Sequence, residues 1–327
     1  MPTSDVPAGA VLTRQLGHTA LAITELGFGS APIGNLFTAL TDATATDAVD
    51  TAWGCGIRYF DTAPQYGHGL AERRLGAALA ARPRDEFVVS TKVGRLVVPN
   101  TTGRSMAEVF AIPDDTELHR DYSADGVRRS LDASLQRLGL DRVDIVLVHD
   151  PDDFVDQAIG ETIPALVRLR DEGVIGAVGV GMNQWQAPLR MVEQTDVDVV
   201  MIAGRWTLID RSAAPLLAAC RERGVGVLAA APYNSGLLAT DAPRADATFD
   251  YQPADTQKVE LARGYAALAE QHGVTLPELA VQFPLRDPAT TAVVAGMRTA
   301  AEVRACVARL QRVVPDSAWQ AVGRSHA

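Results

Sequence analysis

Cysteine is scarce in this chain of 327 residues, which has three in all. Cys55, Cys220 and Cys306 lie far apart and none belongs to a CxxC pair, so neither a disulfide framework nor a metal site is indicated. No apolar run reaches the length of a membrane span, and the first residues form neither a basic leader nor an apolar signal segment. We therefore expect buried free thiols, no bound metal, no membrane partner and a cytoplasmic location.

Positive charge is also in short supply. Forty acidic residues oppose 30 basic ones, for a net charge of −10, and no basic stripe interrupts this balance. Since non-specific binding of nucleic acid depends on neutralising phosphates, we expect no nucleic-acid partner. Lysine is the rarest basic residue, because Lys92 and Lys258 are the only two in the chain. A lysine is therefore unusual in this chain, in which arginine is the common basic residue.

The chain is instead rich in apolar residues, which make up 47% of it and favour a globular enzyme. After an apparent hairpin over residues 11–27, short β-branched runs alternate with longer amphipathic segments. The strands are expected at residues 25–30, 57–63, 86–94, 143–150, 175–182, 197–204, 224–232 and 291–297. The helices are expected at residues 46–56, 71–80, 123–139, 156–173, 214–224 and 257–273.

Eight strand-then-helix units joined by short links predict an α/β fold, a closed (β/α)8 TIM barrel with an N-terminal β-hairpin. No linker divides the chain, so we expect a single domain over residues 1–327. Two connections are long, residues 96–122 after the third strand and 238–257 after the seventh. Because both follow strands, both are expected on the C-terminal face of the barrel, where long loops usually shape a site.

Side chains alternate along a strand, so position decides which of them point into the barrel. On the inward faces of the second, third and fourth strands, the last residues are Asp61, Lys92 and His149. Tyr66 follows Asp61 in the next loop. An acid, an amine, an imidazole and a phenol are thus predicted at the rim where such barrels hold their chemistry.

These four residue types together suit proton transfer coupled to hydride transfer. An ammonium group stabilises a phenolate, so we expect Lys92 to lower the pKa of Tyr66 and Asp61 to keep Lys92 charged. Neutral His149 would hydrogen-bond the substrate oxygen or relay a proton. Taken singly, each residue also has a structural interpretation. Asp61 could cap a turn, and Tyr66 could be an ordinary half-buried aromatic residue. Lys92 could extend its ammonium group to water, and His149 could be a core histidine. Their joint placement favours the catalytic interpretation.

Three motifs carry a resemblance to a known family. FDTAPQYGHGLAERRLG (residues 60–76), STKVG (90–94) and LVHDP (147–151) are similar to the motifs that carry the catalytic tetrad of the aldo-keto reductases. The resemblance extends over nearly the whole chain and implies that Tyr66, Asp61, Lys92 and His149 are catalytic. It also implies a nicotinamide cofactor, bound by Gly29, Ser30, Asp61, Asn183, Trp206, Pro232, Tyr233, Asn234, Gly236, Leu237, Gly296, Arg298 and Glu302.

The chain departs from the family pattern around that cofactor. Ala230 and Ala203 stand where the family usually has an aromatic residue and a glutamine, so Trp206 is our candidate to stack on the nicotinamide. Near the adenosine, the carboxylate of Glu302 would accept from a ribose 2′-hydroxyl and repel a 2′-phosphate. Arg298 could pair a phosphate. We expect NAD, with NADP as the alternative.

Five further motifs are similar to those of a branch of the family that oxidises cyclic hemiacetals to lactones. They are GFGSAPIGNLF (residues 27–37), HDPDD (149–153), GVGMNQW (179–185), AGRWTLID (203–210) and APYNSGLL (231–238). The implied substrate is a small sugar, an aldose oxidised at C1; pyridoxal is the alternative within this branch. An NADPH-dependent reductase of aldehydes or ketones and a non-catalytic nucleotide-binding subunit remain open, and so does the oligomeric state. Among the acids after His149, Asp150, Asp152 and Asp153 are either solvated or in contact with substrate, and Asp150 is the best candidate for binding a sugar hydroxyl.

Overall fold

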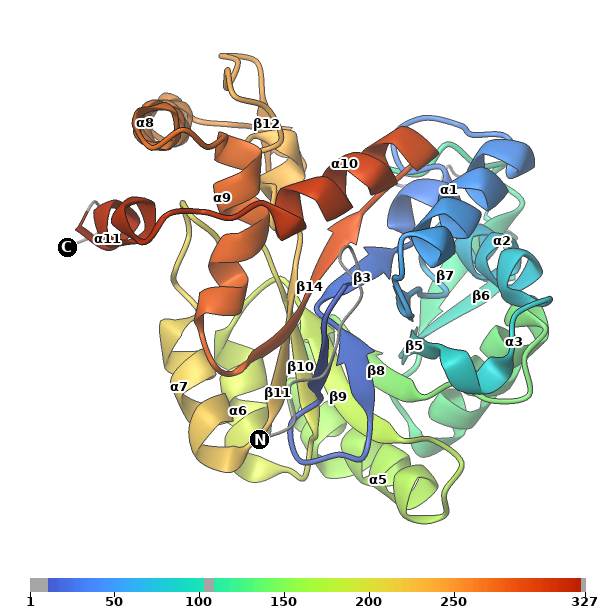
Figure 1. Cartoon of the computed structure of the whole chain (residues 1–327). Helices are drawn as coiled ribbons and strands as arrows, with labels where there is room; N and C mark the ends of the chain where they lie inside the picture. The colour runs from blue at the N-terminus through green and yellow to red at the C-terminus, as the bar shows by residue number, and fades with distance from the viewer. Residues whose placement is uncertain (1–10, 103–108, 325–327) are drawn as a thin grey trace.

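The computed structural model describes residues 11–102 and 109–324. Eight parallel strands close a barrel in the order β10-β11-β14-β3-β4-β5-β8-β9 (Figure 1). The strands are β3 (Leu26–Gly29), β4 (Tyr59–Asp61), β5 (Val88–Val93), β8 (Ile145–His149), β9 (Ala177–Met182), β10 (Val199–Ala203), β11 (Gly226–Ala230) and β14 (Thr290–Gly296). Both the predicted barrel and its eight predicted strands are confirmed. Residues 1–10, where we expected no leader, lie outside the described residues.

A helix follows each barrel strand and covers the outside of the sheet. In chain order these helices are α1 (Asp42–Gly54), α2 (Leu70–Leu79), α3 (Ala124–Leu138), α5 (Ile163–Asp171), α6 (Gln186–Gln194), α7 (Ala214–Arg223), α9 (Leu276–Gln282) and α10 (Ala300–Gln311). Two more, α8 (Thr256–Gln271) and α11 (Asp316–Arg324), pack against each other outside this ring (Figure 1). The barrel thus presents two open ends, and the strands all finish at one of them.

Each of the six expected helix ranges contains a helix, but α10 and α11 near the end of the chain were not among them. The predicted helix at 156–173 is interrupted, since α4 (Val155–Gln157) passes through a π-helical turn (Ala158–Thr162) before α5 begins. Helices α6 and α9 were missed because both are short and contain proline near their start. A capping box between Thr275 and Glu278 was the available signal for α9.

The barrel interior is filled by the predicted inward-facing side chains. Tyr59, Ile145 and Leu147 belong to one buried apolar cluster inside the strands. The predicted N-terminal hairpin, formed by β1 (Thr13–Gln15) and β2 (Ala22–Thr24), adds Leu16 and Ile23 to this cluster. The hairpin therefore closes the end where the strands begin, which leaves the opposite end for a site.

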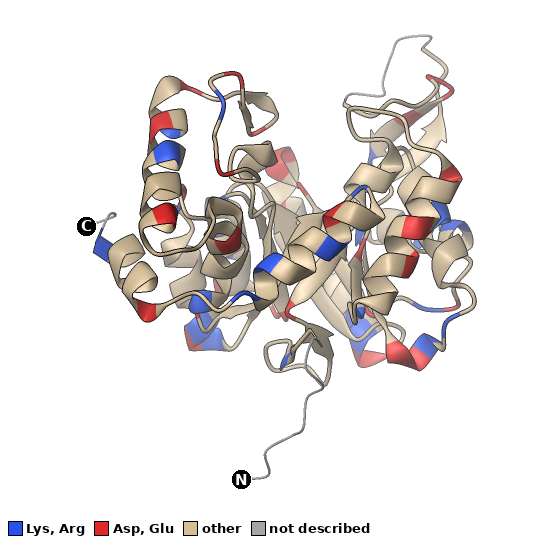
Figure 2. Ribbon diagram, turned by 45° about the horizontal axis from the view of Figure 1, so that its top comes forward, with Lys and Arg blue, Asp and Glu red and all other residues tan. Residues whose placement is uncertain are grey.

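The two long connections each contain a short hairpin. After β5, β6 (Arg95–Pro99) pairs with β7 (Thr116–Arg120), and after β11, β12 (Thr248–Phe249) pairs with β13 (Gln252–Pro253). Both lie on the face where the barrel strands end, as predicted, although residues 103–108 of the first lie outside the described residues. Charges of both signs are spread over the outer helices (Figure 2). No helix among the described residues has the length and apolar character to cross a membrane.

Candidate active site

Lys92 is the centre of the predicted site. It ends the inward face of β5 and is 1% exposed. Its Nζ atom lies 2.9 and 2.7 Å from the two carboxylate oxygens of Asp61, 3.0 Å from the carbonyl oxygen of Thr62 and 3.1 Å from the hydroxyl of Tyr66. A buried ammonium is stable only when it is paired in this way. The structure thus brings Asp61, Lys92 and Tyr66 into one hydrogen-bonded group.

A close backbone contact holds the loop that carries Tyr66. Gly67 has a left-handed φ of +61°, and a Cβ atom placed on it would lie 2.2 Å from the carbonyl oxygen of Gly34. Gly34 is equally tight, since its Cβ would lie 2.8 Å from the backbone of Tyr66. Only glycine fits at both positions. The loop is thereby pinned to the 3-10 turn η1 (Ala31–Gly34), and Tyr66 has a defined position over the rim.

The pKa of Tyr66 does not move in the direction we expected. Burial raises it well above the usual value of 10, and the charge of Asp61 raises it further. Lys92 is shared between Asp61 and the phenol, so its charge is largely offset by the carboxylate. The expectation of a lowered pKa was therefore wrong as to the net direction in the protein alone, because burial and Asp61 outweigh the adjacent ammonium, and Tyr66 is a protonated phenol at neutral pH.

His149 lies beside Tyr66 and is uncharged. Its ring centroid is 5.9 Å from that of Tyr66 in an edge-to-face arrangement, and its side chain is buried. Burial lowers the pKa of His149 well below 6.5, and the charges of Arg95 and Lys92 lower it further. A neutral imidazole was the predicted state. At neutral pH such an imidazole can donate a hydrogen bond to a substrate oxygen, or accept one from a substrate hydroxyl.

Two buried residues beside His149 were not predicted as part of the site. Arg95, at the start of β6, donates to Oδ2 of Asp150 at 3.0 Å. Tyr122 shares its hydroxyl between the carbonyl oxygens of His149 and Asp150, at 2.7 and 2.9 Å. Nothing in the local pattern distinguished Arg95 from 27 other arginines, and the hairpin that turns it back over the rim was not expected.

Most of the predicted cofactor residues follow barrel strands on the same face. Gly29 ends β3 opposite Asp61, and Ser30 donates its backbone N–H to the carbonyl oxygen of Asp61 at 2.9 Å. Asn183 comes directly after β9 and is exposed. The segment Pro232, Tyr233, Asn234, Gly236 and Leu237 follows β11, and Gly296 ends β14. Asn234 and Ser235 in this segment have left-handed φ angles of 45° and 57°, a strain that is typical of ligand-binding loops.

The two predicted adenosine-site residues of opposite charge lie at the start of α10, with Glu302 in its first turn and Arg298 just before the N-cap residue Thr299. The carboxylate of Glu302 accepts from the backbone N–H of Arg298 at 2.7 Å. Cys306, in the next turn of α10, lies 3.7 Å from the hydroxyl of Tyr233, so the loop after β11 touches this helix. The predicted pyrophosphate and adenosine segments are therefore adjacent.

Trp206 is half-buried after β10, and its indole ring lies 5.6 Å from the ring of Phe283 in a tilted arrangement. The indole is thus in contact with the protein through Phe283. The indole nitrogen has no hydrogen-bond partner among the described residues. The structure does not by itself assign Trp206 to the nicotinamide, and that role stays a prediction.

Unpaired polar atoms gather among the predicted site residues. Within the described part of the chain, six buried side-chain atoms of this region lack a hydrogen-bond partner: Ser30 Oγ, Thr62 Oγ1, Arg95 Nε, His149 Nδ1, Trp206 Nε1 and Asn234 Oδ1. Buried polar groups are normally paired, and unpaired ones often mark the place of an absent ligand. These atoms fit a polar cofactor bound across the ends of β3, β4, β8, β10 and β11.

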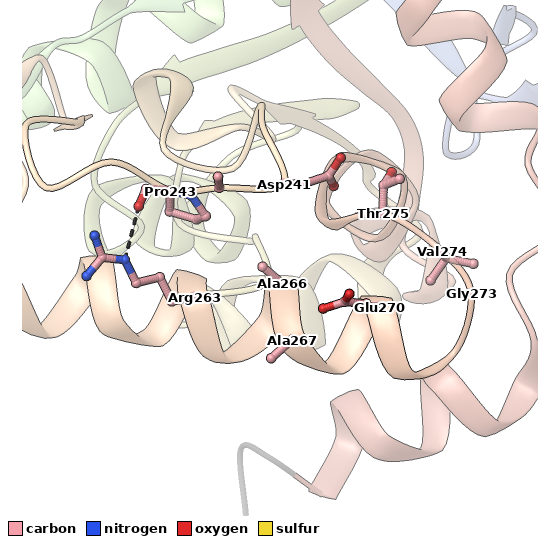
Figure 3. A pocket seen from close by; sticks show the side chains of 10 residues that line it. Asp241, Pro243, Arg263, Ala266, Ala267, Glu270, Gly273, Val274 and Thr275 are labelled. Atoms are coloured by element: carbon pink, nitrogen blue, oxygen red, sulfur yellow. Dashed lines mark hydrogen bonds between the residues drawn. The ribbon is translucent and has the colours of Figure 1, made fainter.

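A separate cleft of about 840 Å³ lies away from these residues (Figure 3). It is formed by the loop around Asp241 and Pro243 and by α8 with Arg263 and Glu270. None of its lining residues belongs to a barrel strand or to the predicted site. Arg263 donates within the cleft wall to the carbonyl oxygen of Pro243 at 3.1 Å. The cleft is a surface feature beside α8 and contains none of the predicted site residues.

Known proteins resemble this chain over most of its length. A sequence profile described as the Aldo/keto reductase family matches residues 25–325. D-threo-aldose 1-dehydrogenase from a Pseudomonas species is 42% identical, covering 91% of this chain and 93% of its own length. Pyridoxal 4-dehydrogenase from Microbacterium luteolum is 36% identical, covering 94% and 95%. Among solved structures, an aldo-keto reductase from Bacillus halodurans in its holo form has a TM-score of 0.76 at 26% identity, covering 96% of both chains.

Proposed function

From the premise that the chain belongs to the aldo/keto reductase family, we propose that it oxidises a free aldose at C1 to the lactone. Hydride passes to a nicotinamide dinucleotide, NAD in preference to NADP. The main supporting observation is the hydrogen-bonded group of Asp61, Lys92 and Tyr66 beside neutral His149. The 42% identity to a D-threo-aldose 1-dehydrogenase supports a sugar as the substrate.

Each of the four side chains has one task in this proposal. Tyr66 takes the proton of the C1 hydroxyl, and Lys92, 3.1 Å away, stabilises the phenolate that must form first. Asp61 keeps Lys92 charged and fixed in position. Neutral His149 hydrogen-bonds the reacting oxygen. The bound dinucleotide supplies the hydride acceptor and, when oxidised, a positive ring that favours the phenolate.

The unpaired buried atoms support the cofactor part of the proposal. Asn234 Oδ1, Ser30 Oγ and Thr62 Oγ1 are the groups that would hold the dinucleotide across the rim. Asn183 would contact the nicotinamide amide, and Gly296, Arg298 and Glu302 would bind the adenosine end. The loop from Pro232 to Leu237 would cover the pyrophosphate.

A second substrate, pyridoxal, is supported by the 36% identity to a pyridoxal 4-dehydrogenase. Its cyclic hemiacetal would undergo the same oxidation to a lactone. The test is a panel of L-fucose, D-arabinose, L-galactose, pyridoxal and simple aldehydes, assayed with each cofactor in both directions. Aldose oxidation with NAD supports the proposal; turnover of aldehydes alone with NADPH contradicts it and assigns a reductase. If no substrate is turned over with either cofactor, the result favours the alternative of a non-catalytic nucleotide-binding subunit.

A further inference from the structure

Asp150 has an unusual backbone conformation directly after the β8 residue His149. Its φ angle is +40°, a region that side chains with a Cβ atom rarely occupy. The surroundings enforce this conformation, since its N–H donates to the carbonyl oxygen of Gly181 at 3.0 Å and its own carbonyl accepts from Tyr122 at 2.9 Å. Strain of this kind persists where the surrounding structure over-determines it, and it clusters at functional sites.

The conformation turns the carboxylate toward the catalytic group. Oδ2 of Asp150 lies 3.7 Å from Nε2 of His149 and accepts from Arg95 at 3.0 Å. Burial raises the pKa values of Tyr66 and Tyr251, and the charge of Asp150 raises both further. The two acids that follow differ in this respect, because the side chain of Asp153 is 80% exposed and that of Asp150 only 18%.

Arg95 and Asp150 are more than a structural ion pair. Two charged side chains are desolvated here, which is rarely favourable unless every polar atom is satisfied. Yet Nε of Arg95 is buried with no partner among the described residues, and no hydrogen bond in that part of the chain uses Oδ1 of Asp150. Burial raises the pKa of Asp150 to about 6 against the opposing charge of Arg95. The pair therefore retains unused hydrogen-bonding capacity next to His149.

We propose that Asp150, held by Arg95, binds the substrate hydroxyl that neighbours the reacting one, and so selects polyhydroxylated hemiacetals. The inference rests on the proposed function, because His149 is taken to hold the reacting oxygen. Neighbouring hydroxyl oxygens of a sugar are about one hydrogen-bond length apart. A carboxylate oxygen 3.7 Å from Nε2 of His149 is therefore placed to accept from the second hydroxyl while the imidazole holds the first. Arg95 acts as a positioning residue for this carboxylate.

The test compares L-fucose with 2-hydroxytetrahydropyran, a cyclic hemiacetal that has no other hydroxyl group. For each enzyme, the ratio of kcat/KM for the sugar to kcat/KM for the hydroxyl-free compound is measured with NAD. In Asp150→Asn this ratio should fall roughly 10- to 100-fold, since a hydrogen bond to a charged group is lost. Asp153→Asn, which makes the same change three residues later on an exposed side chain, should leave the ratio unchanged.

A deoxy sugar locates the hydroxyl. The 2-deoxy analogue should reduce kcat/KM in the natural enzyme by as much as Asp150→Asn does with the full sugar, and combining the two should add little. Should Asp150→Asn fold poorly, Arg95→Lys keeps the positive charge, removes the guanidinium fork and is expected to lower the same ratio. An unchanged ratio in these variants, with normal thermal unfolding, overturns this inference alone. Failure of the natural enzyme to oxidise any aldose overturns the proposed function and this inference together.

Discussion

The amine of Lys92 lies 3.1 Å from the hydroxyl of Tyr66 and yet does not control its protonation alone. Asp61 accepts from the same amine through both carboxylate oxygens, and burial of the phenol acts in the same direction as the charge of Asp61. The three groups therefore form a unit whose net effect depends on a further positive charge. An oxidised nicotinamide ring would supply that charge only when the cofactor is bound.

Replacing Tyr66 by phenylalanine tests the proton-transfer group. We expect Tyr66→Phe to reduce kcat by about 10²–10⁴-fold, because general acid–base catalysis is lost, with cofactor affinity little changed. Steady-state kinetics and fluorescence titration with NADH measure the two quantities. Tyr265→Phe is the matched control, since it removes a phenol hydroxyl that accepts from Arg211 on the far helix α8. Near-normal turnover by Tyr66→Phe would contradict the assignment.

In the proposed mechanism Lys92 and Asp61 have both a structural and a catalytic role, and a double-variant cycle separates the two. Lys92→Met leaves a buried carboxylate unpaired, so we expect it to lower the free energy of unfolding by about 3–5 kcal/mol. Asp61→Asn should also destabilise, and the double variant should lose much less stability than the sum. Turnover should not return in the double variant. Recovered activity together with recovered stability would show that the pair only supports the fold.

The barrel and the placement of Asp61, Lys92 and His149 at one of its rims could be predicted from sequence because both follow from local patterns. Strand parity alone placed Asp61, Lys92 and His149 on one rim, since a buried strand offers only two faces. The pKa of Tyr66 could not be predicted in this way, because its direction depends on the summed burial and charges of residues from several strands. Arg95 was missed for the same reason: the hairpin of β6 and β7 brings it to Asp150, which lies 55 positions away in the chain.

The protonation of Tyr66 predicts how oxidation depends on pH. Because its pKa is raised well above 10 in the protein alone, only the small phenolate fraction can accept a proton at neutral pH. With NAD saturating, kcat/KM for the aldose reports the NAD-bound protein, so we expect it to rise about tenfold per pH unit until the pKa that Tyr66 has in that complex is reached. Stopped-time assays through the neutral and mildly alkaline range measure this dependence. A kcat/KM that does not change with pH across that whole range would contradict Tyr66 as the group that must lose its proton.

Asp150 predicts a second pH effect, seen in selectivity. Its pKa is raised to about 6, so the carboxylate is protonated in the folded protein as the pH falls below that value. The kcat/KM ratio of L-fucose to 2-hydroxytetrahydropyran should therefore decrease below about pH 6, while the titration of Tyr66 cancels in the ratio. The other charged or titratable groups around Asp150 are Arg95, Lys92, Arg120, Asp152, His149, Tyr66, Tyr122 and Tyr251. The variant Asp150→Asn should not show this decrease of the ratio. If the decrease persists in the variant, another titrating group causes it.

The contact between Gly67 and Gly34 predicts a large loss of stability from a single methyl group. Gly67→Ala combines a left-handed φ with a Cβ 2.2 Å from a carbonyl oxygen, whereas Gly139→Ala has a similar φ of +64° and open space. We expect Gly139→Ala to destabilise by about 1–2 kcal/mol and the clash at Gly67 to add about 1–3 kcal/mol. Urea unfolding measures both, and only Gly67→Ala should also impair kcat by moving Tyr66. Equal effects of the two variants would contradict this account.

The last prediction concerns the choice of cofactor. The carboxylate of Glu302 is fixed by the backbone N–H of Arg298 at the start of α10, where a 2′-phosphate would meet its negative charge. Glu302→Gln keeps the shape and removes the charge, so we expect the affinity for NADPH relative to NADH to rise about tenfold. Glu222→Gln, an exposed glutamate on α7, is the control for lost charge outside the site. If the two dissociation constants keep their ratio in Glu302→Gln, the carboxylate does not select the cofactor, and Arg298 becomes the residue to vary.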